Sequence, residues 1–500
     1  MQSTKRAKQL MQIAVKTIEL FLTIIEGILR FLLGIAESIV ASSDDKKYKA
    51  SFASSWSLLS PWNYGFNLTG NKKLSVKDSY QNSLVIASTG MGKTSVVMLP
   101  CLYSMKGSFC IHDPSGEIFL KSSGYLKSKG YEIKVLNFSK PEISCGYNPL
   151  ARANSNSYIQ KISSMLVENS LGGHGSKDPF WTNMAISLLT MLITILKTQD
   201  IQYQNLCNIR HLLNQMGGNP EAVDALFSLY ADQILFAEYK SFIAYDEKVI
   251  SGTIASCKAA LNIFNDPAVA KVTSVDNLNM DEFREKPTAL YIQNSVADQK
   301  YYSVLTSIFT EQFFSYVMSR FAQNGEQDIF FLIDEASSLK LPTLQLAVSN
   351  VRKHRAGIML IIQSENQLTN LYGKPEAEAI KANCFAKMYF SGASLETAKE
   401  LEQILGKYEY KDKEKSKVVR PLMESSEIRI MKANQALLIC GHHAPIKATL
   451  IPYYKNLKYK NYPLIPPPVL SSSVPEILPI LTLPKPNAED KTEQSYLAVS

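Results

Sequence analysis

The stretch Ser83-Leu-Val-Ile-Ala-Ser-Thr-Gly-Met-Gly-Lys-Thr94 joins a short apolar run to a glycine-containing loop that ends in lysine and threonine. The run predicts a buried strand, and Lys93 or Thr94 is the predicted start of a helix. Glycines in such a loop let backbone N–H groups converge on phosphate oxygens, while the lysine reaches the β and γ phosphates and the hydroxyl serves magnesium. We therefore expect a nucleoside triphosphate to be held by Ser88, Thr89, Gly90, Met91, Gly92, Lys93, Thr94 and Ser95.

Further apolar runs place this loop in an α/β fold. Helical patterns alternate with these runs, which predicts a mainly parallel, doubly wound sheet of the RecA-like P-loop type. The general loop pattern begins with glycine where this chain has Ala87, so the strand–loop–helix context carries the interpretation. Strands are predicted at 83–87, 109–112, 132–136, 289–293, 329–333, 358–362 and 386–390.

Changes of pattern along the chain predict five segments. Long helical periodicity from about 155 to 281 indicates an all-α domain inserted into the α/β core, and proline- and serine-rich sequence after Pro463 predicts a disordered tail. Acidic residues interleave with the lysines of 407–417, which favours a solvated loop over a DNA-binding patch there. The segments are an N-terminal membrane-associated helix (1–45), a first nucleotide-binding part (46–154), the all-α domain (155–281), a second nucleotide-binding part (282–462) and the tail (463–500).

Composition narrows the class of protein. A chain of 500 residues that is 46% hydrophobic can bury a large core, which excludes global disorder. The net charge of +8 is mild for this length and allows a locally basic surface that would suit nucleic acid. The seven cysteines are scattered without a Cys-x-x-Cys pair, so we expect reduced structural thiols in a cytosolic compartment, and the six histidines lack a metal-ligand spacing.

The segment from Leu10 to Ala41 is mostly aliphatic but carries charges at intervals. At 100° per residue these charges fall within an arc of about 80°, which predicts one long helix with a narrow polar stripe. Charges at the centre of a span cost about 2.5 to 3.5 kcal/mol each, so a lone membrane span is disfavoured. Three placements remain open: an interfacial helix on the membrane, insertion beside a partner, and a soluble helical contact. The charges are Lys16, Glu19, Glu26, Arg30 and Glu37, and Lys5, Arg6 and Lys8 favour the cytoplasmic side.

A second part of the site is predicted after the apolar run 329–333. Asp334 emerging beside the phosphate loop can hold the magnesium shell, partly through water, and Glu335 can orient or polarise the attacking water. The simpler interpretation is that both carboxylates only cap a helix beginning at Ala336. Gln363, after the next strand, is a candidate sensor of the γ phosphate.

Two arginines lie between these strands, in Arg352-Lys-His-Arg355. Ring-shaped motors commonly place an arginine of one subunit against the γ phosphate of its neighbour, and either Arg352 or Arg355 is a candidate. The alternative interpretation, which has about equal weight, is that these residues form the solvated basic end of a helix. The turn Asp113-Pro-Ser-Gly-Glu117 follows a predicted strand at the edge where such folds bind ligands, or is only a turn.

Taken together, these residues resemble the coupling proteins of type IV secretion and conjugation systems. The resemblance covers about Ser83 to Tyr454 and rests on phrases that occur in the order that this family shows. They are Gly90 to Thr94, Asp113-Pro-Ser-Gly-Glu117, Tyr147-Asn-Pro-Leu150, Asp178-Pro-Phe-Trp181, Leu332-Ile-Asp-Glu-Ala336, Ile362-Gln-Ser364 with Tyr372-Gly373, and Arg420-Pro-Leu-Met423.

The resemblance implies a P-loop ATPase that forms a homo-hexamer at the cytoplasmic face of the bacterial inner membrane. It implies ATP and Mg²⁺ as cofactors, and DNA, a relaxase or relaxosome and the secretion channel proteins as partners. By motif position, the resemblance assigns the family's site roles to Lys93, Thr94, Asp334, Glu335 and Gln363. The absence of an Asn-Lys-x-Asp guanine signature also favours ATP.

Three functions remain open at this point. The leading one is a conjugative motor that recruits a relaxase–DNA substrate and drives or gates its transfer, with DNA contacted through its phosphates and without sequence preference. The second is a receptor ATPase that recruits protein effectors without pumping DNA. The third and more distant one is a septal-type DNA translocase, which the phrases at Asp113 and Asp178 disfavour.

Overall fold

The structure is a computed structural model that describes residues 48–171, 179–294, 297–411, 416–472 and 474–485. The predicted N-terminal helix over 1–45 lies outside these residues. The described chain divides into a smaller unit, made of 48–51 with 405–411 and 416–422, and a larger unit that holds the rest.

The larger unit is built on a sheet of nine strands in the described residues, in the order β11-β10-β7-β1-β6-β5-β2-β4-β3. The seven strands from β7 to β3 run parallel, whereas β10 is antiparallel to both of its neighbours. Every strand predicted from the apolar runs is present, and β10 and β11 were not predicted. The bounds are β1 Ser83–Ile86, β2 Ser108–His112, β3 Glu132–Asn137, β4 Thr288–Gln293, β5 Ile329–Ile333, β6 Ala356–Ile362, β7 Ala386–Phe390, β10 Gln435–Cys440 and β11 Ile446–Thr449.

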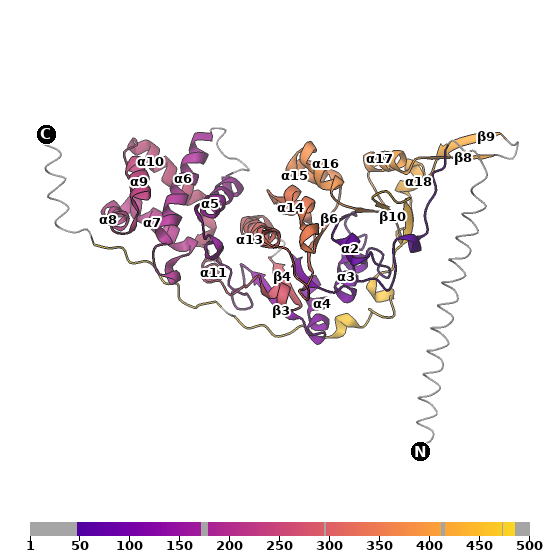
Figure 1. Ribbon diagram of the computed structural model, residues 1–500, viewed down its shortest axis with the longest axis horizontal. Coiled ribbons are helices and arrows are strands. Elements are labelled where there is room, and N and C mark those ends of the chain that lie inside the picture. Colours follow the sequence, from indigo (N-terminus) through magenta and orange to yellow (C-terminus); the bar gives the residue numbers. More distant parts are fainter. Residues whose placement is uncertain (1–47, 172–178, 295–296, 412–415, 473, 486–500) are drawn as a thin grey trace, which may run out of the picture. The chain divides into compact units, whose positions relative to one another are not determined.

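Helices cover the sheet, as expected for parallel strands that are buried on both faces. A π-helical turn over Thr94–Met98 leads from the phosphate loop into α3, and α3 packs against α4 (Figure 1). The helices of this part are α2 Val76–Ser79, α3 Leu99–Ser104, α4 Glu117–Ser128, α12 Glu282–Glu285, α13 Gln299–Ser319, α14 Leu344–Asn350, α15 Glu365–Tyr372, α16 Lys374–Ala382, α17 Leu395–Leu405 and α18 Ser425–Arg429.

Between β3 and α12 the described residues hold helices and no strand. α6 packs against α5, α7, α9 and α10 (Figure 1), and eight of its side chains are buried. It is the one described helix long and apolar enough to cross a membrane, and in this structure it is the core of the helical part. The helices are α5 Asn156–Leu171, α6 Pro179–Leu196, α7 Leu206–Gly218, α8 Pro220–Tyr230, α9 Gln233–Ile243, α10 Glu247–Ala260 and α11 Pro267–Val272.

The chain enters and leaves the helical part through two segments that bond to each other. Tyr147 donates its backbone N–H to the Val272 carbonyl (2.8 Å), and the Gly146 N–H bonds to Oδ1 of Asn277 (2.7 Å). Arg152 forms an ion pair of 2.8 Å with Asp276. We call these two segments, 146–152 and 272–278, the neck.

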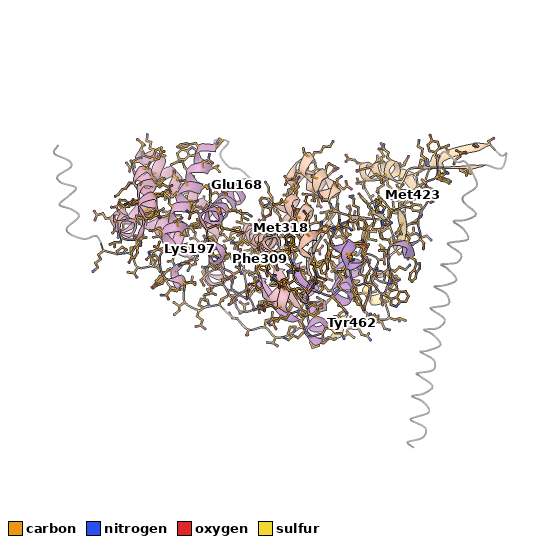
Figure 2. All side chains as sticks on the ribbon, in the orientation of Figure 1. Glu168, Lys197, Phe309, Met318, Met423 and Tyr462 are labelled. Carbon is orange, nitrogen blue, oxygen red and sulfur yellow. The ribbon has the colours of Figure 1, made fainter. Side chains whose placement is uncertain are left out.

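Aromatic side chains of α13 join the neck to the sheet. Phe309 is fully buried (Figure 2), and its ring meets that of Tyr147 edge to face with 5.0 Å between centroids. Phe313 and Phe314 contact Phe331 of β5 in the same way, at 5.0 and 4.8 Å. Such contacts favour one rotation of α13 over the sheet.

The predicted disordered tail is wrong for the described residues beyond Leu464, which form an extended strap. The strap starts beside Tyr462 (Figure 2), whose ring stacks on Tyr125 at 4.0 Å. It reaches Leu481, a side chain only 5% exposed. Asn208 of α7 accepts the Leu481 N–H (2.9 Å) and donates to the Pro479 carbonyl (3.1 Å). Proline-rich sequence is already restricted when unfolded, so ordering it costs less entropy than the composition alone suggests.

The smaller unit corrects a second prediction. Residues 407–411 (β8, Lys407–Lys411) and 417–421 (β9, Lys417–Pro421) pair as an antiparallel ribbon, not as a solvated loop, and Lys49 bridges to Tyr408. The rings of Tyr408 and Tyr410 stack at 5.7 Å on one face. The charged residues that suggested a loop alternate with these rings, which is the period of a strand.

Candidate nucleotide-binding site

The phosphate loop begins where β1 ends at the carboxyl edge of the sheet. Its backbone is fixed by the Ala87 N–H, which bonds to the Ile362 carbonyl of β6 (3.0 Å), and by the Val96 N–H, which bonds to the Gly92 carbonyl (2.8 Å). Val96, Val97 and Met98 are buried beneath the loop, whereas Ser88, Thr89 and Gly90 are exposed. A fixed base and an exposed tip leave the backbone amides open to a ligand.

Two glycines of the loop are required by its backbone. Gly90 and Gly92 have φ of +80° and +84°, a region that residues with a Cβ rarely adopt. A Cβ added to Gly90 would meet nothing within 4 Å, so that side of the loop is open space. Ala87 is not among the described residues with positive φ, which explains why alanine suits the position where the general pattern has glycine.

Asp334 and Glu335 lie at the same edge, after β5. Burial raises the pKa of Asp334 to about 6, Lys93 opposes this shift, and the carboxylates of Glu335 and Asp113 add to it. Lys93 therefore lies close enough to Asp334 for its charge to act on the carboxylate. Glu335 has φ of +54° and does not cap the short helix Ala336–Ser338 through its side chain, which disfavours the simple capping interpretation.

His112 and Asp113, at the end of β2, complete this edge. His112 Nδ1 donates to the Asp334 carbonyl oxygen at 2.7 Å, and burial lowers the pKa of the imidazole, which keeps it neutral. Asp113 accepts the N–H groups of Ile118 and Phe119 (3.2 and 2.7 Å) and so caps α4. The sequence prediction missed His112, because its partner is a backbone carbonyl that no side-chain pattern reveals.

Gln363 begins the segment after β6, where its N–H bonds to Oε1 of Gln367 (2.9 Å). It lines a hollow beside the phosphate loop. Ala87 and Ser88 of the loop, Tyr389 of β7 and the turn 391–394 are among the residues that line it. Gln363 is thus placed at the carboxyl edge, within the same group of loops as Lys93.

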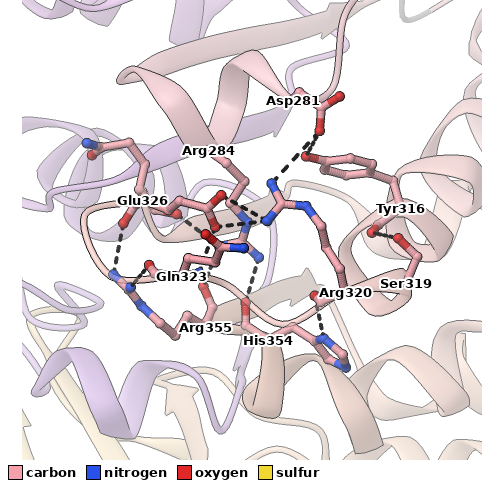
Figure 3. A network of polar contacts seen from close by, with 10 residues as sticks. Asp281, Arg284, Tyr316, Ser319, Arg320, Gln323, Glu326, His354 and Arg355 are labelled. Atoms are coloured by element: carbon pink, nitrogen blue, oxygen red, sulfur yellow. Dashed lines mark hydrogen bonds and ion pairs between the residues drawn. The ribbon is translucent and has the colours of Figure 1, made fainter.

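The two candidate arginines lie at the opposite, amino edge of the sheet, before β6. Arg355 is held within its own chain. Its guanidinium bonds to Oδ1 of Asp328 at 2.8 Å. It also bonds to the carbonyls of Gln323 and Glu326, both at 3.0 Å (Figure 3). Arg352 is exposed and bonds to Oε1 of Gln81 at 3.1 Å. Arg355 therefore has a structural role within its own chain, whereas Arg352 lies at the surface.

A buried arginine that the sequence did not single out supports this turn. Arg284 is 2% exposed and donates to the carbonyls of Gln327 (2.9 Å), His354 and Arg355 (Figure 3). These bonds satisfy three backbone oxygens of the segments before β5 and β6, including that of Arg355, whose φ is +50°. Arg284 thus fixes the conformation from which Arg352 projects.

The strand order with the phosphate loop after β1 and the paired acids after β5 defines a RecA-like P-loop nucleotide-binding fold. Solved structures share it. The bacterial conjugative coupling protein TrwBdeltaN70 aligns with a TM-score of 0.64 at 17% identity, over 88% of this chain and 98% of that one. TrwB in complex with ADP and Mg²⁺ aligns with a TM-score of 0.63 at 19% identity, over 81% and 95%.

Residues 58–476 match the family described as type IV secretory system conjugative DNA transfer, and the chain belongs to this family, which confirms the resemblance seen in its motifs. VirD4 of Agrobacterium fabrum is 23% identical over 75% of this chain, which covers 59% of that protein. A probable conjugal transfer protein TraG of Sinorhizobium fredii is 22% identical over 73% of this chain, which covers 61% of that protein. The chain thus spans about three fifths of the length of these curated relatives.

Proposed function

We propose that this protein is a conjugative type IV coupling protein, a hexameric ATPase that recruits a relaxase–DNA substrate to the secretion channel and drives or gates its transfer. Its place would be the cytoplasmic face of the bacterial inner membrane. One observation carries the proposal: in a chain of the conjugative DNA transfer family, Lys93 after β1 lies close enough to Asp334 after β5 to lower its pKa, beside an open glycine loop. This is the arrangement that triphosphate hydrolysis requires.

Each residue of the carboxyl edge has a role in this proposal. The amides of 88–95 hold the phosphates, and the Lys93 ammonium neutralises their charge. Glu335 orients the attacking water and takes its proton, and Gln363 contacts the γ phosphate. Arg352 of one subunit stabilises the charge that develops in the site of its neighbour.

The donor set fits a magnesium ion. Among the described residues no three His, Cys, Asp or Glu side chains group as a complete metal site. Magnesium usually takes one or two protein oxygens and completes its shell with phosphate oxygens and water, which agrees with the Thr94 hydroxyl and the Asp334 carboxylate as ligands. The ion would neutralise charge on the phosphates.

ATP is the proposed nucleotide. TrwB, which shares the fold, has been solved with ADP and Mg²⁺, with the ATP analogue ADPNP and with the GTP analogue GDPNP. No charged side chain lines the hollow beside Gln363 and Tyr389, and its walls combine apolar side chains with serine hydroxyls. Comparing hydrolysis of ATP and GTP by the same preparation measures the base preference.

The deciding experiment measures ATP hydrolysis by the oligomeric full chain with and without single- and double-stranded DNA. We expect DNA to stimulate hydrolysis and Lys93→Ala to abolish it while leaving the thermal unfolding midpoint unchanged. Glu335→Gln should bind ATP and fail to hydrolyse it. Lys77→Ala, an exposed lysine of α2, is the matched control and should behave as the unaltered chain.

This assay, together with a measurement of cargo transfer by the same variants in cells, separates the alternatives. Hydrolysis that DNA does not stimulate, with cargo transfer still dependent on Lys93, would favour a receptor that recruits protein effectors. Transfer that survives Lys93→Ala would refute the motor outright.

A further inference from the structure

Three exposed aromatic rings and two lysines gather on one side of the larger unit. The rings of Trp56, Trp62 and Tyr64 are 44%, 63% and 46% exposed, and the two indole centroids lie 6.1 Å apart. Nζ of Lys72 lies 4.2 Å from the centre of the Trp56 ring, and Nζ of Lys106 lies 4.2 Å from that of Tyr64. We call these five residues the aromatic–lysine patch.

We propose that the aromatic–lysine patch docks the protein on an anionic lipid surface, with the rings in the interfacial region of the bilayer and the lysines at its phosphates. The proposal rests on the proposed function only for the membrane setting. The nucleotide site takes no part in it.

The rings are exposed although the segment that carries them is held firmly. Leu59 and Phe66, on either side of Trp62 in the sequence, are fully buried in the core. Ser60 and Lys73 exchange both backbone hydrogen bonds at 2.9 Å, and the Asn63 side chain bonds to the Lys73 carbonyl at 3.1 Å. The Lys72 ammonium also donates to Oγ of Ser55 (2.6 Å). The rings are thus exposed on a segment that hydrogen bonds and buried side chains hold in one conformation.

The patch lies at the amino edge of the sheet, opposite the phosphate loop. Lys106 lies two residues before β2, and the Ala53 N–H bonds to the carbonyl of Pro445, which precedes β11. Both strands start at this edge because β11 runs antiparallel to β10 and so parallel to β7. Nothing in the chemistry of triphosphate hydrolysis accounts for indole rings at this distance from the nucleotide.

The residue types favour a bilayer. Tryptophan and tyrosine concentrate where hydrocarbon meets headgroups, and lysines near an anionic surface each contribute about 1 kcal/mol of binding. The patch also follows the aliphatic segment 10–41, which we expect on a membrane, by only about 15 residues. An extended chain of that length reaches at most about 50 Å, so the patch stays close to any surface that holds the segment.

Stacked nucleic-acid bases fit the patch less well. Bases stack on rings that offer a free, parallel face. The two indole planes are tilted by 39° to each other, and an ammonium group covers one face of Trp56 and one face of Tyr64. An interfacial site makes no such demand, because the rings insert by their edges.

The tryptophan content of the chain makes a direct test possible. The chain has three tryptophans, so Trp181→Phe leaves an emission that reports only Trp56 and Trp62. With vesicles of phosphatidylcholine plus phosphatidylglycerol we expect this emission to shift to the blue and to be quenched by brominated acyl chains. Vesicles of phosphatidylcholine alone should give a smaller change, and high salt should reverse the binding.

A second measurement uses co-sedimentation of the full chain with the same vesicles. Lys72→Ala with Lys106→Ala should weaken binding to anionic vesicles about fivefold for each lysine removed, which is the fold-change that 1 kcal/mol gives. Lys248→Ala with Lys432→Ala, two exposed lysines outside the patch, is the matched control. ATP hydrolysis should be equal in both double variants. Vesicle binding therefore tests the patch, and hydrolysis tests the proposed ATPase function independently.

Two outcomes would overturn the proposal. One is a protein that sediments with anionic vesicles while bromine leaves the Trp56 and Trp62 emission unquenched. The other is emission that responds to single-stranded DNA and not to vesicles, which would assign the patch to nucleic acid. As a control, the same vesicle titration is made with the unaltered chain, in which Trp181 adds a constant emission. Equal changes in both proteins show that Trp181→Phe has not altered the fold.

Discussion

Nδ1 of His112 lies 2.7 Å from the carbonyl oxygen of Asp334, so the imidazole at the end of β2 holds the backbone of the acidic residue at the end of β5. Because a carbonyl only accepts, the proton is on Nδ1, and burial lowers the pKa of the ring and keeps this neutral form. The bond fixes Asp334 without using its carboxylate.

His112→Phe should leave the Asp334 carbonyl without a donor. We expect a loss of about 1–3 kcal/mol in the free energy of unfolding and a fall of about tenfold in apparent Mg²⁺ affinity during ATP hydrolysis. Titration of activity with Mg²⁺ measures the second effect. His112→Asn, which keeps a donor, should recover part of it, and an unchanged Mg²⁺ dependence in His112→Phe would remove His112 from the site.

Alanine at Arg355 should lower the stability of the fold, whereas alanine at Arg352 should lower ATP hydrolysis. Arg355→Ala removes the bonds to Asp328 and to two carbonyls and should cost about 2–3 kcal/mol of stability in urea unfolding. Arg352→Ala should change stability by less than about 0.5 kcal/mol, because this side chain is exposed. In the oligomer it should lower hydrolysis by about a thousandfold.

Mixing subunits tests whether Arg352 acts in a neighbour. Arg352→Ala and Lys93→Ala proteins are each expected to be inactive alone. In mixed oligomers a Lys93→Ala subunit can still present Arg352 to the intact phosphate loop of an Arg352→Ala subunit, so hydrolysis should reappear. Mixtures that stay inactive would show that Arg352 serves its own subunit or none.

Asn208 should control the attachment of the strap. Asn208→Ala removes the acceptor for the Leu481 N–H and the donor to the Pro479 carbonyl, so we expect the Leu481 amide to lose about 1–3 kcal/mol of protection in hydrogen exchange. Ser472→Ala removes an exposed bond to the Pro141 carbonyl and should have little effect. Equal protection in both variants would mean that Asn208 does not hold the strap.

Lys73 should make stability depend on pH. Burial, and then the charge of Lys458, lowers its pKa to about 8, so the folded state disfavours the ammonium that the unfolded chain carries up to about 10.5. The unfolded state therefore binds more protons between these values, and stability rises with pH across this window. Lys73→Met should be more stable than the unaltered chain by about 1–3 kcal/mol at pH 7, and the gap should close as the pH rises towards 10. Urea unfolding at both pH values measures it, with Lys77→Met as a control that shows no gap.

The parallel sheet was predictable because each of its buried strands is a short apolar run with polar or glycine-containing sequence on either side. β10 and β11 were missed, although Ala436 to Ile439 is apolar, because their antiparallel pairing depends on β7 and not on local pattern. The ribbon 407–421 and the strap escaped prediction for a related reason. Their composition is polar or proline-rich. The ribbon is ordered by pairing between its own two strands, and the strap by contacts distant in sequence, such as that of Leu481 with Asn208.

Some residues of the site were also predictable from the sequence and others were not. Lys93 and Asp334 were predictable because glycine spacing and a strand that ends in acid fix their positions, and the structure brings them together. His112 and Arg284 were not, because both act on backbone carbonyls of other segments. Arg355 shows the converse case, since its charge suggested a role between subunits while its bonds lie within its own chain.

The neck has a mechanical consequence. The chain passes between sheet and helices twice, and the Tyr147–Val272 bond and the Arg152–Asp276 ion pair clamp these two passages side by side. Two connections bonded to each other restrain rotation of the helical part relative to the sheet more than a single connection would. The strap is a third connection between the same parts, held at one end by Tyr462 and at the other by Leu481.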